Sequence, residues 1–309
     1  MRVSKVIGFG ALNVDNIFKV NNLSLAENPA HPVDVQAGGN AANTITALAK
    51  LGVGCGFVGV VASDAYGKLI ISEFKRRNID ISRIIFRKSA DSLISSGLVE
   101  TYVDKRGRRM LFVKPGVNGT LSINEINSDY FNKASVVHFT SFVDDQQFHI
   151  QKMLIKKIPD KVTVSFAPGS LYAERGLKAL EPFIERTDIL FLARRETYYL
   201  TGMSFKKAVE KLLTMGPRIV IVTFGDKGSF IATKGEQFIV KARKVKVVDT
   251  TGAGDAYAAG FLYGIVNNFP IKRCAEIASA LASFSVQKLG ARAGLPNRKE
   301  LSAVVSLAK

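Results

Sequence analysis

The chain has 309 residues, of which 47% are hydrophobic, and 43 Lys and Arg against 26 Asp and Glu give it a net charge of +17. This length and apolar content predict one large domain with its own core, and they exclude a short disulfide-built scaffold. The two cysteines, Cys55 and Cys274, lie far apart in sequence, which is typical of a reducing compartment. We find no secretion signal and no apolar run long enough to span a bilayer, so we expect a cytoplasmic protein.

The excess of basic residues favours anionic partners, either nucleic acid or a small phosphorylated ligand, and charge alone does not separate the two. The basic residues are spread along the chain, and no basic segment carries interleaved aromatic residues. We therefore expect a solvated basic surface, with no specific nucleic-acid partner and no membrane contact. His31, His138 and His149 lack the spacing of metal ligands, and His138 lies in a strand pattern that favours the core.

The first elements are short and polar residues follow them. Residues 5–10 predict a buried strand that ends in glycine. Asn13 and Asp15 are two positions apart, so they point to the same side of an extended segment. They could bind sugar hydroxyls or simply form a turn. Residues 16–36 contain two prolines and some alternation, which suits edge strands or a flap.

Residues 37–43 are rich in glycine and open a helix that we expect to reach Lys50. Glycines let the backbone approach a ligand closely, and the Asn43 amide offers both a donor and an acceptor. The next glycine run, at 54–59, fits the dinucleotide fingerprint G-x-G-x-x-G. We discount it because a helix precedes it and a strand at 57–61 follows, the reverse of the order that fingerprint needs.

A helix is expected at residues 64–77, and strands at 94–103 and 110–113 are joined by a hairpin-like turn. Such a hairpin within an alternating helix and strand pattern predicts a small separate sheet. We expect residues 12–36 and 94–114 to form a β lid that excludes water from the substrate. Asn118 begins a glycosylation sequon, which we interpret as a chance match.

The pattern becomes regular from residue 135, and strands fall near 135–140, 161–166, 188–192 and 218–223. Helical segments between them predict βαβ units, a mostly parallel sheet, and ligands at the carboxyl ends of its strands. A hairpin then follows, and the last third is helical. The hairpin strands are expected at 228–233 and 236–241, and the helices at 255–267, 271–287 and 297–307.

One stretch combines these signals. Residues 245–248 have strand character up to Asp249, a turn of small residues follows, and a helix is expected to begin near Ala256. Gly252 and Gly254 leave backbone N–H groups uncovered at a helix start, which is a favourable place for an anion. Asp255 then has two readings, as the N-cap of the helix or as a general base beside a phosphate.

Residues 249–255 resemble the anion-hole motif of the ribokinase-like (PfkB) carbohydrate kinase family. Asn13 with Asp15, and Gly38-Gly39 with Asn43, are similar to the substrate end of that family. The resemblance covers most of the chain, from Gly10 to about Pro296. It implies a doubly wound α/β fold with helices on both faces, and transfer of a phosphoryl group from ATP to a sugar hydroxyl.

The resemblance also implies roles for individual residues. Asp255 would be the general base, with Gly252, Ala253 and Gly254 as the anion hole, and the substrate would be held by Asn13, Asp15, Gly39 and Asn43. The nucleotide would contact Thr223, Gly225, Gly228 and Glu196, and a monovalent cation would bind at Asp249 and Thr251 beside residues 285–290. The cofactors implied are ATP and Mg²⁺, with K⁺ at the cation site, and the relatives' habit of pairing through their lids implies a homodimer.

Three positions depart from the family pattern. Ala193 stands where an N-x-x-E motif has its asparagine, although Glu196 remains, and Ala167 stands where many relatives have aspartate. Residues 137–141 lack the sugar-binding glutamate of ribokinase. These departures weaken the case for ribose as the substrate and leave the metal geometry open.

Other functions stay open at the level of sequence. A nucleoside acceptor would need an apolar slot for its base, for which Phe112 and Phe142 are candidates, whereas Asn13 with Asp15 favours a sugar. The net charge of +17 keeps a nucleic-acid-binding protein as a remote alternative. Ala193 and Ala167 keep a nucleotide-binding protein without catalysis as another.

Overall fold

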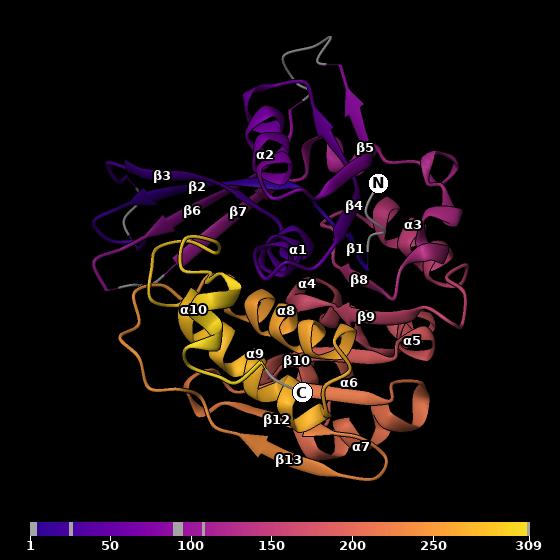
Figure 1. The fold of residues 1–309 in the computed structure, drawn as a ribbon. Helices are drawn as coiled ribbons and strands as arrows, with labels where there is room; N and C mark the ends of the chain where they lie inside the picture. The colour runs from indigo at the N-terminus through magenta and orange to yellow at the C-terminus, as the bar shows by residue number, and fades with distance from the viewer. Residues whose placement is uncertain (1–4, 25–26, 89–94, 107–108, 308–309) are drawn as a thin grey trace.

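The computed structural model describes residues 5–24, 27–88, 95–106 and 109–307, which form two sheets flanked by helices (Figure 1). The larger sheet has nine strands in the order β13-β12-β11-β10-β9-β8-β1-β4-β5. These strands are β1 (Val6–Phe9), β4 (Cys55–Ala62), β5 (Asp80–Arg87), β8 (Val136–Thr140), β9 (Thr163–Ala167), β10 (Ile189–Ala193), β11 (Ile219–Thr223), β12 (Ser229–Ala232) and β13 (Gln237–Val240). Neighbouring strands from β11 to β5 are parallel, while the β12–β13 hairpin is antiparallel.

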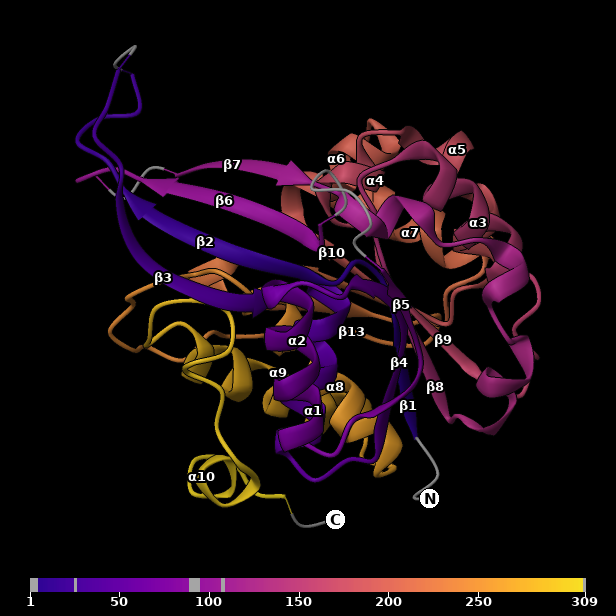
Figure 2. The ribbon, with the colours of Figure 1, turned by 90° about the horizontal axis from the view of Figure 1, so that it is seen from above.

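Helices cover both faces of this sheet, as Figure 2 shows. The helices of one face are α1 (Asn40–Lys50), α2 (Ala65–Arg76), α8 (Ala253–Val266), α9 (Ile271–Ser285) and α10 (Arg298–Ser302). Those of the other face are α3 (Asp145–Ile155), α4 (Gly169–Ala173), α5 (Gly176–Arg186), α6 (Arg194–Thr201) and α7 (Phe205–Met215). Short 3₁₀ segments lie at Gly116–Thr120, Ile123–Glu125, Ser128–Lys133 and Gly225–Lys227.

The central strands are mostly apolar because both of their faces are buried, and β10 is apolar at every position. In β10, Ile189 and Phe191 pack in the core beneath α8, whereas Leu190 and Leu192 pack in the core beneath α5 and α7. Successive side chains of a strand point to opposite faces, so a continuous apolar run fills two cores at once. This arrangement confirms the predicted doubly wound α/β fold.

The smaller sheet has the order β3-β2-β6-β7 and extends away from the larger one (Figure 2). Its strands are β2 (Asn13–Lys19), β3 (His31–Gly38), β6 (Gly97–Val103) and β7 (Arg109–Lys114). They come from the two segments in which we expected a separate sheet, although residues 25–26, 94 and 107–108 of those segments lie outside the described residues. The lid role of this sheet stays a prediction.

The prediction of a strand before Asp249 is wrong. Residues 245–248 form no strand, and the side chains of Val247 and Val248 are 57% and 56% exposed. The N–H groups of Val248 and Asp249 both donate to the carbonyl of Val286, at 2.8 and 3.2 Å. The valines had suggested a strand, but these N–H groups bond to the end of α9 instead of a neighbouring strand.

Other boundaries also differ. Helix α8 begins at Ala253, before the expected start, with Gly252 as its N-cap. Asp255 is therefore the third residue of the helix, and its reading as the N-cap is wrong. The strand β5 was not predicted, because it is an edge strand with exposed polar residues, and α10 ends at Ser302, short of the expected 307. Within the described residues no helix is both long and apolar enough to cross a bilayer.

Candidate active site

The N-terminus of α8 carries the turn in which the sequence predicts an anion site. Gly252 has φ 72°, and a Cβ on it would lie 2.5 Å from the Ala291 Cβ, so only glycine fits. The first intrahelical bond joins the Ala256 N–H to the Gly252 carbonyl at 2.8 Å, and the Ala253 N–H donates to the Thr250 carbonyl at 3.2 Å. The Ala253 amide thus holds the turn, while the amides that follow it point out of the helix end.

Asp255 lies where the first turn of α8 meets the first turn of α1. Asn43 Nδ2 donates to Asp255 Oδ2 at 2.8 Å, and Thr44 Oγ1 donates to the Asp255 carbonyl at 3.2 Å. Burial raises the pKa of Asp255 to about 7, against the effect of the Asn43 hydrogen bond. The charges of Asp15 and Glu196 also raise it. A carboxylate that titrates near neutral pH is suited to take a proton from an alcohol.

Asn13 and Asp15 lie on the same face of β2, as expected from their spacing. Asn13 Oδ1 accepts a hydrogen bond from Asn118 Nδ2 at 3.0 Å. Asp15 packs against Gly38, where a Cβ would lie 2.5 Å from Asp15 Oδ2, so the glycine makes room for the carboxylate. Burial raises the pKa of Asp15 to about 6. The structure thus brings the predicted substrate residues to one region beside α1.

Asn118 has a structural role that the sequence analysis did not predict. Its side chain is 2% exposed, and its Nδ2 donates to the carbonyls of Leu12 and Pro115 as well as to Asn13, each at 3.0 Å. Its Oδ1 accepts from the Leu12 N–H at 2.9 Å. A buried side chain with these partners fixes the turn between β1 and β2, which agrees with the view that the sequon is a chance match. Leu12 and Asn13 lie more than 100 residues away along the chain, so no local pattern could reveal these contacts.

Gly39 joins the small sheet to α1. It is the N-cap of α1 with φ 96°, and its carbonyl accepts the Asn43 N–H at 2.8 Å. A Cβ on Gly39 would lie 2.2 Å from the Ala11 carbonyl oxygen and 3.5 Å from the Asn13 nitrogen. Gly39 therefore lets the turn that carries Asn13 pass close to the helix that carries Asn43.

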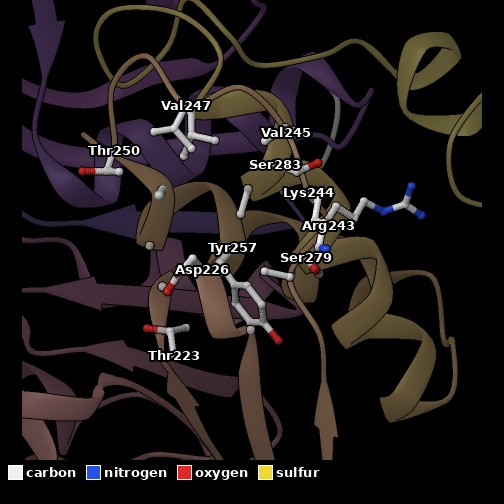
Figure 3. Close-up of a pocket in the computed structure, with 17 residues that line it drawn as sticks. Thr223, Asp226, Arg243, Lys244, Val245, Val247, Thr250, Tyr257, Ser279 and Ser283 are labelled. Atoms are coloured by element: carbon white, nitrogen blue, oxygen red, sulfur yellow. The ribbon is translucent and has the colours of Figure 1, made fainter.

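A cleft of about 470 Å³ opens on the other side of the α8 N-terminus (Figure 3). Three of the predicted nucleotide residues line it, Thr223, Gly225 and Gly228, together with Ala253 and Gly254 of the predicted anion hole. Figure 3 shows Thr223 and Asp226 on one side of Tyr257, with Val245 and Val247 on the other. The remaining lining residues are Ala242, Arg243, Lys244, Thr250, Ser279, Ala282, Ser283 and Val286. An apolar wall that leads to a helix N-terminus suits a base and sugar attached to phosphates.

Glu196 does not line this cleft but lies in the first turn of α6. Its Oε2 accepts the Ala193 N–H at 2.7 Å, and its Oε1 accepts from Ser170 Oγ at 3.4 Å. Burial raises the pKa of Glu196, and its charge acts on Asp255, so both carboxylates face one region. Glu196 thus caps α6 through the N–H of Ala193, the residue that stands where the family pattern has asparagine.

Asp249 and Thr251 tie the turn before α8 to the loop after α9. Asp249 is 4% exposed, and its Oδ1 accepts from the N–H and the hydroxyl of Thr251 at 2.9 and 2.8 Å. Its Oδ2 accepts from the Gly290 N–H at 2.8 Å. A second cavity, of about 140 Å³, lies between this turn and the small sheet, and Asp15 and Thr101 also line it.

The two phenylalanines that we considered as walls of a slot for a nucleoside base lie in different environments. Phe142 is 1% exposed and packs edge-on against Phe9 with ring centroids 5.7 Å apart, so it belongs to the core and cannot line a slot. Phe112 is 50% exposed on β7 and packs edge-on against Tyr102. The apolar sequence around Phe142 does not distinguish a core position from a pocket wall.

The comparisons with known proteins agree with this fold and site. The pfkB family carbohydrate kinase profile matches residues 3–298. An uncharacterized sugar kinase of Archaeoglobus fulgidus is 35% identical over 252 residues, which cover 81% of this chain and 98% of that protein. Ribokinase of Thermotoga maritima is 27% identical with a TM-score of 0.85, and covers 96% of this chain and 98% of its own. A nucleoside kinase of Methanocaldococcus jannaschii is 25% identical with a TM-score of 0.81, and covers 97% of each chain.

The match extends over nearly the whole chain, and the glycine-rich turn that precedes α8 lies at the carboxyl ends of the parallel strands. The chain belongs to the pfkB family of carbohydrate kinases.

Proposed function

We propose that this chain transfers the terminal phosphoryl group of ATP to a hydroxyl group of a sugar. The observation that carries the proposal is the position of Asp255, between two sets of predicted ligands. Asn13, Asp15 and Asn43 provide polar groups on one side. The cleft lined by Thr223 and Gly254 lies on the other side. An alcohol and a triphosphate bound at these places would meet at the α8 N-terminus.

The chemistry follows from this arrangement. Asp255 takes the proton of the acceptor hydroxyl as its oxygen attacks the γ-phosphorus, and the bond from that phosphorus to the bridging oxygen of ADP breaks. The negative charge of the moving phosphoryl group develops at the N-terminus of α8, where backbone N–H groups and the helix dipole stabilise it. Asn13, Asp15 and Asn43 orient the acceptor so that one hydroxyl faces Asp255.

Mg²⁺ neutralises phosphate charge when it is bound with ATP. In the described ranges no group of three His, Cys, Asp or Glu side chains could hold a metal ion. Mg²⁺ usually binds through the substrate phosphates and one or two carboxylates. Glu196 would be the carboxylate that fits this need, because its charge acts on Asp255 at the end of the cleft. We therefore propose that Mg²⁺ enters with ATP.

We also propose that Asp249 and Thr251 hold K⁺ beside the loop at residues 285–290. The support is the buried Asp249 carboxylate, whose charge also raises the pKa of Asp15 and is therefore close to a second acid. A monovalent cation there would offset this charge and fix the turn before α8. Turnover is expected to rise when K⁺ replaces choline in the assay, and an equal turnover in both salts would contradict the cation site.

A sugar is favoured over a nucleoside because polar side chains of β2 and α1 dominate the acceptor side, whereas Phe142 is not available as a wall. A nucleoside remains the alternative acceptor, because one of the relatives is a nucleoside kinase. The test is a screen of neutral sugars, sugar acids and nucleosides with ATP, ADP and GTP as donors, read by ³¹P NMR of the product. The absence of phosphorylated product from every acceptor would reject the kinase proposal.

We propose that the small sheet acts as a lid over the acceptor and as the contact of a homodimer. Gln36 Nε2 on β3 donates to the Leu289 carbonyl at 3.4 Å, which links the sheet to the loop after α9. The edge strands β3 and β7 carry exposed apolar side chains, among them Val35 and Leu111 at 49% and 56%. Sedimentation should give twice the monomer mass, and Leu111→Glu should give a monomer.

The expected cytoplasmic location also stays a proposal. Its support is that Cys55 and Cys274 are both buried and unpaired. We further propose that nucleic acid and membranes are not specific partners, because the basic residues are scattered. Binding of DNA at physiological salt with sequence preference would contradict this.

Replacement of Gly254 by alanine should separate stability from catalysis. A Cβ at this position meets no atom within 4 Å, and the residue lies in the first turn of α8 with a helical backbone. The free energy of unfolding should therefore rise by up to about 1 kcal/mol, because alanine favours a helix over glycine. The methyl group would project into the cleft where phosphate passes, so kcat should fall. Steady-state kinetics and urea unfolding measure the two effects, and an unchanged kcat would remove Gly254 from the anion hole.

A further inference from the structure

Of the lysines and arginines in the described part of the chain, Arg292 alone is buried, at 6% exposure. It lies in the loop after α9, and its guanidinium donates to oxygens of three separate elements. Nε donates to Asn43 Oδ1 at 2.7 Å on α1, and Nη1 donates to Glu73 Oε2 at 2.6 Å on α2. Nη2 donates to the Gly38 carbonyl at 2.9 Å at the end of β3. No pattern in the sequence distinguishes this residue from the other Lys and Arg residues, which number 43 with it.

The first of these bonds fixes the orientation of the Asn43 amide. A guanidinium has donors and no acceptor, so the Asn43 oxygen must face Arg292. The Asn43 nitrogen then faces Asp255, to which it donates at 2.8 Å. In the flipped orientation the amide oxygen would face a carboxylate oxygen and the amide nitrogen would face a cation, so two attractive contacts would become repulsive.

Glu73 holds Arg292 in its place. This carboxylate is 9% exposed, and it pairs with Arg292 through Oε2 and with Arg77 Nε through Oε1 at 3.5 Å. A buried charge requires such a partner, since desolvation without one is costly. The guanidinium already meets three protein oxygens and is buried, so it is not presented to a ligand as a free anion site. A chain of contacts thus runs from Glu73 through Arg292 and Asn43 to Asp255.

We propose that Arg292 is a positioning residue that holds Asn43 in the orientation in which it hydrogen-bonds to Asp255. Arg292 acts through Asn43 and does not contact the reacting atoms. This inference rests on the proposed function, because it concerns the readiness of the proposed base. Two further charged groups act on Asp255, the carboxylates of Asp15 and Glu196, and both favour its protonated form. Arg292 opposes them with its charge as well as through Asn43.

The test is Arg292→Met, which keeps the length of the side chain and removes its charge and donors. The pKa of Asp255, followed by ¹³C NMR of its carboxyl carbon without substrate, should rise by about one unit or more. The acidic limb of kcat/KM should move to higher pH by the same amount, and kcat should recover in part at alkaline pH. Glu73 still has Arg77 as a partner in this variant, which limits the damage to the fold.

Arg77→Met is the matched control. Arg77 pairs with the same Glu73 carboxylate but makes no contact with Asn43, so the Asp255 titration and kcat should stay unchanged. A fall in kcat at all pH values with an unshifted Asp255 titration in Arg292→Met would show a purely structural role and would overturn the proposal. An Asp255 pKa that rises equally in Arg77→Met would also overturn it.

Two further provisions keep the test decisive. If Arg292→Met has lost ATP binding and cooperative unfolding, Arg292→Gln takes its place, because it removes the charge but keeps a donor for Asn43. The Asp255 pKa should then rise by less than one unit, because only the charge is lost, and a rise of one unit or more would count against the proposal. The NMR titration needs no turnover, so a wild-type protein that phosphorylates no acceptor would reject the proposed function while Arg292 is still tested.

Discussion

Asp255→Asn is expected to lower kcat by about 10²–10⁴-fold, the usual contribution of general-base catalysis. Asparagine has nearly the same shape, and its side-chain oxygen can still accept the hydrogen bond from Asn43 Nδ2, so the fold should be kept. What is lost is the ability to take a proton. The affinity for ATP, measured by calorimetry, should change little because Asp255 does not line the nucleotide cleft.

The pH dependence of kcat/KM provides an independent test of Asp255 as the general base. A base must be deprotonated to act, and burial raises the pKa of Asp255 to about 7. The value of kcat/KM in the wild type should therefore fall as the pH decreases through about 7, and Asp255→Asn should lack this limb. A limb that persists unchanged in the variant would assign the titration to another group.

Asp145→Asn is the matched control, because Asp145 is also an aspartate in the first turn of a helix, α3, and its side chain is 77% exposed. The same chemical change away from the site should leave kcat as it is. Near-normal turnover of Asp255→Asn, or an equal loss in the control, would remove Asp255 from the role of base.

Gly39→Ala is expected to lower both the stability and the affinity for the acceptor. At φ 96° an alanine is strained, and its Cβ would lie 2.2 Å from the Ala11 carbonyl oxygen. Strain and clash together should lower the free energy of unfolding by about 2–5 kcal/mol. The Ala11 turn leads directly into Asn13, and Asn43 lies one turn into α1, so both acceptor contacts should shift. Urea unfolding and the KM for the acceptor measure the two losses.

Gly52→Ala provides the comparison at the other end of α1. Gly52 has φ 86°, but a Cβ there meets nothing within 4 Å. Only the backbone strain remains, which should cost about 1–2 kcal/mol, and KM should stay unchanged. Equal losses of stability in the two variants would mean that the close approach of Gly39 to Ala11 has no effect beyond backbone strain.

Much of the architecture could be predicted because its signals are local. The strands β8 to β11 are short and mostly apolar, with a helix between each and the next, and this alternation requires a parallel sheet buried on both faces. The strand expected at 245–248 failed because strand character in a sequence says nothing about a hydrogen-bonding neighbour. The N–H groups of Val248 and Asp249 donate to the carbonyl of Val286 instead.

In the candidate site, too, local signals could be predicted and contacts between distant residues could not. Gly39, Gly252 and Asp255 stand in short motifs, since a tight turn into a helix needs glycine at fixed positions and leaves its mark in consecutive residues. The sequence by itself therefore determined the sheet, the turn before α8 and the identity of the acid within it. Only the tertiary structure decided that Asn118 fixes Asn13 and that Arg292 fixes Asn43, because each of these contacts joins residues more than 100 positions apart. The orientation of a buried amide or guanidinium depends on which groups the fold brings to it, and the neighbouring residues in the sequence do not indicate those groups.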